Sequence, residues 1–122
     1  MLQGNFFNIT RIHQKENSVQ ASLELNDEHK IFDGHFPQTP VVPGVCMMQM
    51  VKEIFEDVIG KETKIINAGH IKFLSIINPQ HTKNIQLDLK YTLEENKKAI
   101  VVASLFNETV IYFKFKGLMK IS

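Results

Sequence analysis

The chain has 122 residues, 43% of them hydrophobic, which is enough for one buried core. Its 14 basic and 13 acidic side chains give a net charge of +1, so no strong positive field is available to hold a nucleic acid or an anionic membrane. The single cysteine excludes an intramolecular disulfide, and no apolar run approaches the roughly 20 residues that span a bilayer. The opening sequence MLQGNFFNIT lacks the basic and apolar regions of a secretory signal. We therefore expect one cytoplasmic domain over residues 1–122 that binds neither nucleic acid nor membrane.

Two runs near the start alternate as strands do. Residues 6–14 alternate roughly, residues 15–17 make a turn, and residues 18–25 alternate strictly. In the second run Val19, Ala21, Leu23 and Leu25 share one face. The pattern predicts a hairpin or two neighbouring strands.

A stiff loop and one long helix follow. Three of the four prolines lie within residues 33–43, and a residue that precedes proline is pushed out of the helical region. From Gly44 to Ile59 the apolar residues recur at three- and four-residue steps, which predicts a helix that ends at Gly60. Its first half, VCMMQMV, is apolar almost all round and predicts burial on every side, whereas its second half is amphipathic.

The remaining residues predict an antiparallel meander. Four runs with strand character cover residues 63–77, 85–93, 99–106 and 110–121, and short polar turns separate the last three. The expected fold class is therefore α+β, with an antiparallel sheet wrapped around one long helix. A single helix cannot cover both faces of such a sheet, and the edge of the sheet needs pairing, so we expect a dimer.

The segment that indicates chemistry is GHFPQTPVVPGV, residues 34–45. It places His35, a residue that titrates near neutral pH, in a proline-stiffened loop that leads into a helix start. Free N–H groups at such a start can polarise a carbonyl, and Gly44 allows a ligand to approach the backbone. By spacing alone His35 is better interpreted as an ordinary surface or capping residue. The repeated prolines would also suit a polyproline ligand, but the interleaved Phe36, Val41 and Val42 argue against exposure.

This segment resembles the signature G-H-F-P-x-x-P-[VI]-x-P-G-V of hotdog-fold 3-hydroxyacyl-(acyl carrier protein) dehydratases. Ala68-Gly69, Lys72-Phe73 and Pro79 match the strand that follows the central helix in that family. The resemblance implies the hotdog fold, a homodimer or higher even oligomer, and the lyase reaction that removes water from a 3-hydroxyacyl thioester in fatty-acid or related lipid synthesis.

The resemblance also implies roles for individual residues. His35 would remove the α-proton and the N–H of Gly44 would hold the thioester carbonyl. Gln49 stands fourteen residues after His35, where the family has an acidic residue that reaches the site from the other subunit. We expect Gln49 to face His35 across the dimer interface, although glutamine cannot deliver a proton as a carboxylic acid does. The expected substrate contacts are Phe36, Pro37, Val41, Val42, Val45, Met48 and Phe73, with core packing the alternative for Met48 and Phe73.

No cofactor is expected, because loss of water needs only proton transfers, and no histidines or cysteines have the spacing of metal ligands. The implied partner is an acyl carrier protein that bears a phosphopantetheine thioester, or acyl-CoA. Leu74-Ser75 replace residues that are often basic in the family, so Lys72 is what remains of the rim that would contact an acidic carrier. This predicts weaker or differently placed docking, with Arg11 and Lys30 as further candidates.

Two other functions fit the same residues. Because Gln49 replaces the carboxylate, the chain could be a non-catalytic hotdog subunit that binds acyl groups or completes a heterodimer. A hotdog acyl thioesterase is the other alternative, although such enzymes generally lack this proline-rich loop and usually also use a carboxylate.

Overall fold

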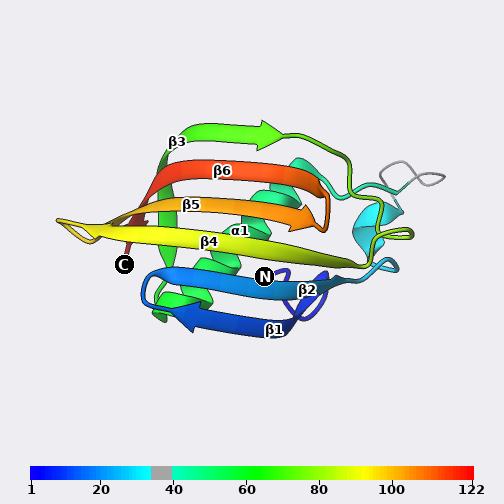
Figure 1. Cartoon of the computed structure of the whole chain (residues 1–122), viewed down its shortest axis with the longest axis horizontal. Coiled ribbons are helices and arrows are strands. Elements are labelled where there is room, and N and C mark those ends of the chain that lie inside the picture. Colours follow the sequence, from blue (N-terminus) through cyan, green and yellow to red (C-terminus); the bar gives the residue numbers. More distant parts are fainter. Residues whose placement is uncertain (34–39) are drawn as a thin grey trace.

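The computed structural model describes residues 1–33 and 40–122 and contains one sheet and one long helix (Figure 1). In chain order the elements are β1 (Phe7–Lys15), β2 (Ser18–Leu25), a short 3-10 turn η1 (Lys30–Phe32), α1 (Gly44–Ile59), β3 (Thr63–Phe73), β4 (Asn84–Glu94), β5 (Lys98–Asn107) and β6 (Val110–Ile121). The six strands have the order β1-β2-β4-β5-β6-β3, and every neighbouring pair is antiparallel.

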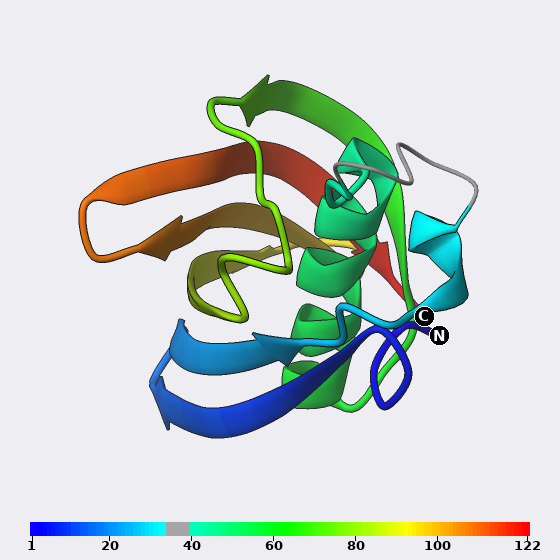
Figure 2. The same ribbon diagram turned by 90° about the vertical axis from the view of Figure 1, so that its right-hand side faces the viewer.

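The sheet curls around α1, which lies along its inner face (Figure 2). Alternate strand residues point inward, as their period of two requires, and meet the apolar side of the helix. Met50, Val51, Ile54 and Phe55 of α1 are fully buried there. The strands contribute Val19, Leu23, Ile85, Leu87, Leu89, Val101, Leu105, Phe113 and Phe115 to the same core. The predicted α+β class, an antiparallel sheet wrapped around one helix, is confirmed.

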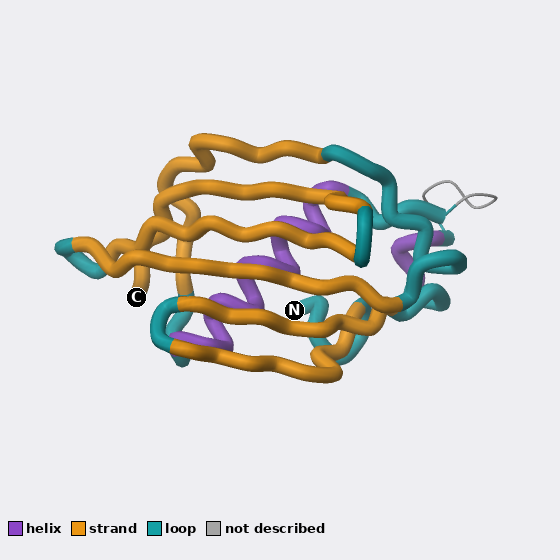
Figure 3. The backbone as a smooth tube through the Cα atoms, viewed as in Figure 1, coloured by secondary structure: helices purple, strands orange, loops and turns teal. Residues whose placement is uncertain are grey.

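One strand is shorter than its sequence pattern predicts. The apolar run extends to residue 77, but β3 ends at Phe73 (Figure 3). The N–H groups of Leu74 and Ser75 both donate to the carbonyl of Tyr112, at 2.8 and 3.3 Å, and the chain then leaves the sheet. Ile77 is fully buried, and its carbonyl accepts a 2.9 Å hydrogen bond from the N–H of Val42. Ile77 therefore supports the segment that leads into α1.

The two outer strands of the sheet each have one unpaired edge. Among the strands that the structure describes, β1 pairs only with β2 and β3 pairs only with β6 (Figure 3). Nearly all of β3 is exposed in this chain, including the apolar side chains of Ile66 and Ile71. An exposed edge with apolar side chains is a surface on which another strand can pair.

The start of α1 differs from expectation. The sequence predicts burial on every side, but Val45 is 78% exposed, and Met48 and Gln49 are half-buried. The prediction is wrong for the single chain because the sheet covers only one side of the helix. Among the described residues, no helix has both the length and the apolar character needed to cross a membrane.

Candidate functional site

The N-terminus of α1 begins at a residue that cannot cap it. The N-cap is Pro43, whose side chain makes no capping hydrogen bond. The first amides that bond to its carbonyl belong to Cys46 and Met47, at 3.0 and 3.2 Å. Within the described part of the chain, the N–H groups of Gly44 and Val45 therefore have no backbone acceptor. Such N–H groups, together with the helix dipole, make this position suited to an oxygen that carries negative charge.

Gly44 lies against the ring of Phe73 at the end of β3. A Cβ atom added to Gly44 would lie 2.8 Å from Cε1 and Cζ of Phe73, which is closer than van der Waals contact allows. The ring also packs against Phe113 on the neighbouring strand, with centroids 5.3 Å apart, and remains 56% exposed. The absence of a side chain at position 44 therefore brings an aromatic surface directly beside the first amides of the helix.

The helix start is surrounded by apolar side chains that no other described part of this chain covers. Val45 is 78% exposed, and Leu74 and Ile76, which follow β3, are 52% and 71% exposed. An exposed apolar surface next to hydrogen-bond donors is typical of a ligand site or a protein interface.

The other predicted substrate contacts differ from one another in how deeply they are buried. Val42 is buried in the core at 4% exposure, Val41 is half-buried, and Met48 packs against the core while remaining half-buried. Gly44 and Phe73 are in contact, with Val45 beside Gly44 on the exposed side of the helix. His35, Phe36 and Pro37 lie outside the described residues.

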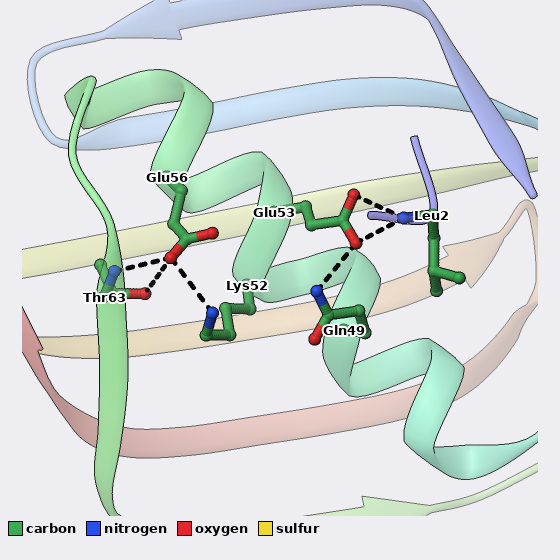
Figure 4. A network of polar contacts seen from close by, with 6 residues as sticks. All are labelled: Leu2, Gln49, Lys52, Glu53, Glu56 and Thr63. Carbon is green, nitrogen blue, oxygen red and sulfur yellow. Dashed lines mark hydrogen bonds and ion pairs between the residues drawn. The ribbon is translucent and has the colours of Figure 1, made fainter. Parts of the chain in front are cut away.

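Gln49 contacts a carboxylate one helical turn further on, a contact that the sequence analysis missed. Its Nε2 donates to Oε2 of Glu53 at 2.8 Å, and Glu53 also accepts from the backbone N–H of Leu2 at 2.8 and 3.0 Å (Figure 4). The backbone N–H of Gln3 donates to Glu53 as well, at 2.9 Å. Glu53 is only 3% exposed, although the amphipathic pattern places it on the solvent side. The four-residue spacing of Gln49 and Glu53 is the signal that could have revealed the pair.

The surroundings of Glu53 keep it ionised. Burial by itself raises the pKa of this carboxyl group, but the hydrogen bonds from Leu2, Gln3 and Gln49 outweigh burial and hold the pKa below its ordinary value. Glu53 is therefore an acceptor and not a source of protons at neutral pH. Because a carboxylate only accepts, it faces the NH₂ group of Gln49, and the Oε1 of Gln49 points away from it.

A second carboxylate on the same helix stabilises its other end. Glu56 accepts from the N–H and the hydroxyl of Thr63, at 2.6 and 3.1 Å, and pairs with Lys52 at 3.1 Å (Figure 4). These bonds tie α1 to the start of β3 and leave Glu56 with no evident chemical task.

The remaining reactive groups do not form a site of their own. Burial raises the pKa of the Cys46 thiol, which keeps it protonated and unreactive. In residues 1–33 and 40–122 no three histidine, cysteine or acidic side chains gather as metal ligands would. Lys72 is exposed and is the neighbour of Phe73 on β3, so it points to the opposite face of the sheet from the helix start. Arg11 is exposed on β1, and Lys30 lies in η1.

Comparison with known proteins identifies a family. A sequence model described as ApeI-like, ApeI dehydratase, matches residues 11–114. Among solved structures, the dehydratase heterocomplex ApeI:P from Xenorhabdus doucetiae has a TM-score of 0.67 at 18% identity, covering 92% of this chain and 96% of that one.

Two further structures have the same fold. An uncharacterised protein from Erwinia carotovora subsp. atroseptica has a TM-score of 0.60 at 21% identity and covers 93% of this chain and 91% of its own. A sigma28-regulated virulence protein from Campylobacter jejuni has a TM-score of 0.67 at 13% identity, with 92% and 82% covered. No curated protein matches the sequence. These structural likenesses show the hotdog fold, and the family match carries the assignment.

Proposed function

Because this chain belongs to the ApeI-like dehydratase family, we propose that it catalyses the reversible dehydration of (3R)-3-hydroxyacyl thioesters carried by an acyl carrier protein. The proposed setting is cytoplasmic fatty-acid or related polyene and lipid assembly. The observation that supports this most is the start of α1, where Pro43 leaves the first N–H groups uncapped and Gly44 brings Phe73 beside them. A thioester carbonyl fits that position, with its acyl chain along the apolar residues.

Polarisation of the carbonyl is the step for which this geometry is suited. An α-proton of a thioester is too weakly acidic for imidazole to remove unless the developing enolate is stabilised. The N–H of Gly44 and the positive end of the helix dipole would stabilise the negative charge on the carbonyl oxygen. His35, by its position in the motif, would then take the α-proton.

The leaving hydroxyl needs a proton that Gln49 cannot supply. We assign both proton transfers to His35: the imidazolium formed by α-proton removal returns that proton to the 3-hydroxyl as the C–O bond breaks. The double bond forms between the α- and β-carbons, and water leaves. Gln49, whose amide nitrogen bonds to Glu53, would accept a hydrogen bond from the hydroxyl through Oε1.

The proposed active unit is a dimer, a homodimer or higher even oligomer in which a second hotdog chain covers the helix start. Two features of the single chain support this: the unpaired edge of β3, and the exposed Val45, Leu74 and Ile76. A second chain that pairs along β3 would satisfy the edge and bury these side chains. It would also bring its own Gln49 toward His35.

The first test is hydration of a crotonyl thioester and dehydration of a 3-hydroxyacyl thioester by the purified chain. His35→Ala is expected to lower kcat/KM by roughly 100-fold or more, the usual contribution of a general base. His81→Ala, at an exposed histidine before β4, is the matched control and is expected to leave activity unchanged. Equal activity of the His35→Ala variant and the parent would refute the assignment, and release of free acid would indicate a thioesterase.

The contact between Gln49 and Glu53 decides how a carboxylate should be restored. Gln49→Glu alone would place two carboxylates 2.8 Å apart, which repel each other. The double exchange Gln49→Glu with Glu53→Gln keeps one acid and one amide in contact, and the amide oxygen introduced at position 53 can still accept from the N–H groups of Leu2 and Gln3. Higher activity in the exchanged variant than in the parent would measure the cost of the missing acid.

A non-catalytic partner subunit is the second candidate. It is favoured by two facts about position 49: glutamine has no acidic proton to deliver, and its NH₂ group is already bonded to Glu53. In this case the chain alone, and the exchanged variant, would be inactive. Activity would appear only on mixing with a second hotdog chain from the same source, and His35→Ala would not abolish it.

A further inference from the structure

The outer face of the sheet, which is turned toward the viewer in Figure 1, carries a cluster of basic side chains over β3, β4 and β6. Its exposed side chains Lys72, Lys90, Lys114 and Lys116, with His70, surround a hollow of about 500 Å³. We call these five residues the basic face. Asp88 is the one acidic residue that lines the same hollow within the described part of the chain.

The register of the strands places basic residues directly opposite one another. Lys72 on β3 is the partner of Lys114 on β6, and His70 is the partner of Lys116. Directly opposite residues have Cβ atoms about 5 Å apart, and like charges in such pairs destabilise a sheet. Among the residues that the structure describes, neither Asp88 nor any other acidic side chain forms an ion pair with these lysines.

Over β1 and β2 the basic residues have neutral partners instead, because Arg11 is opposite Ser22, His13 is opposite Gln20 and Lys15 is opposite Ser18. There Ser22 donates to Gln86 at 2.9 Å, Gln20 is opposite Asp88, and Glu24 is opposite Asn84. Neutral, acidic and basic residues are mixed there, and cross-strand neighbours such as Ser22 and Gln86 bond to each other. Basic residues directly opposite other basic residues therefore lie along β3, β6 and the start of β5, a concentration expected of a surface that meets an anionic partner.

The basic face lies directly behind the candidate site. Phe73 and its partner Phe113 point toward the start of α1, and the residues beside them in sequence, Lys72 and Lys114, point to the outer face. Because β3 ends at Phe73, only the thickness of the sheet at the end of this strand separates the basic face from the candidate site. A partner on the basic face can reach the site around the end of the strand.

Resting on the proposed function, we propose that the basic face, and not the residues that follow Phe73, docks the acidic surface of the acyl carrier protein. A second copy of this chain would bring lysines against lysines if it used the same face. The described residues of the hollow include no arginine, and Val102 is its main exposed apolar side chain, which disfavours nucleic acid. Carboxylates of an acidic protein complement it.

The test compares Lys114→Glu/Lys116→Glu with Lys61→Glu/Lys97→Glu. Both double variants reverse two exposed lysines, and the second pair lies at the opposite end of the sheet. Each is assayed with one acyl group carried either by holo-acyl carrier protein or by free pantetheine. The basic-face variant is expected to raise KM for the carrier-borne substrate by roughly tenfold or more, while KM for the pantetheine substrate stays the same. The control variant is expected to change neither.

A direct titration with fluorescently labelled holo-acyl carrier protein makes the result independent of turnover. Kd is expected to weaken by roughly tenfold in the basic-face variant, and the parent's Kd to weaken between about 0.05 and 0.5 M NaCl. Equal Kd in parent and variant would overturn the docking proposal even if the chain is an active dehydratase. Binding without turnover would overturn the proposed function alone. Tighter binding of the parent to anionic vesicles or duplex DNA than to the carrier protein would also overturn the docking proposal.

Discussion

The two ends of α1 are built differently. At its C-terminal end the N–H of the left-handed Gly60 donates to the backbone carbonyl of Glu56. The side-chain carboxylate of Glu56 accepts from Thr63 and Lys52, so the chain itself completes the helix. At its N-terminal end Pro43 provides no cap, and Gly44 and Val45 lie beside exposed apolar side chains. One end therefore stabilises the fold, whereas the other leaves hydrogen-bond donors and apolar side chains exposed in the single chain.

The largest effect on stability is expected between the two ends, at Glu53. Glu53→Ala removes a buried carboxylate and leaves the N–H groups of Leu2 and Gln3 and the amide of Gln49 without their acceptor. We expect a loss of about 3 kcal/mol in the free energy of unfolding. Urea denaturation measures it. Glu94→Ala is the control, because it removes the same carboxylate from an exposed residue at the end of β4, and its free energy of unfolding should change little.

Gly44→Ala, at the N-terminal end of the helix, is expected to lower activity more than stability. The added methyl group would lie 2.8 Å from the ring of Phe73. Because this half-exposed ring can move outward, the free energy of unfolding should change by less than about 1 kcal/mol. Displacing the ring from beside the helix amides is expected to lower kcat/KM by roughly 10- to 100-fold. Kinetics and thermal melting of one sample test both, and unchanged kcat/KM would contradict the assigned carbonyl position.

The pH dependence of stability is expected to reveal the ionised Glu53. Its folded-state pKa is lowered, so the stabilisation that it provides is complete above the unfolded pKa of about 4.3 and is lost as the pH falls through the lower folded value. Glu53→Gln does not titrate. The difference in unfolding free energy between parent and variant should therefore be constant from neutral pH to about pH 5 and shrink below it. A constant difference down to about pH 3 would contradict this.

Glu56→Ala is expected to lower the free energy of unfolding by about 1 to 2 kcal/mol, because it removes the acceptor for the N–H and hydroxyl of buried Thr63. Activity per folded molecule should be retained, because Glu56 lies away from the helix start. Chemical denaturation measures the loss of stability, and kcat/KM measures the retained activity. A loss of activity without a loss of stability would assign Glu56 a chemical role.

Gly60→Ala should produce the smallest effect. The residue has φ of 69°, and a Cβ atom there would meet nothing within 4 Å, so only the backbone conformation opposes the change. We expect the free energy of unfolding to fall by about 1 kcal/mol and kcat/KM to stay unchanged. Compared with Gly44→Ala, this variant shows whether each glycine is needed for its conformation or for the space beside it.

Local sequence determined most of the elements. Strict alternation in Ser18–Leu25 and the three- and four-residue steps of Gly44–Ile59 predicted β2 and α1 at their observed bounds, because each period matches one backbone geometry. The motif at residues 34–45 predicted the hotdog family and the place of Gly44 at the helix start. Its proposed contacts at His35, Phe36 and Pro37, and the meeting of Gln49 with His35, remain predictions.

Tertiary structure alone decided the rest, because it depends on segments far apart in the chain. The contact of Glu53 with Leu2 and Gln3 spans 50 residues or more, so helical periodicity assigned this buried carboxylate to the solvent face. The end of β3 at Phe73 depends on Tyr112, and the exposed start of α1 depends on how far the sheet reaches around it. The basic face likewise exists only because strand register brings Lys72 opposite Lys114, which no local pattern specifies.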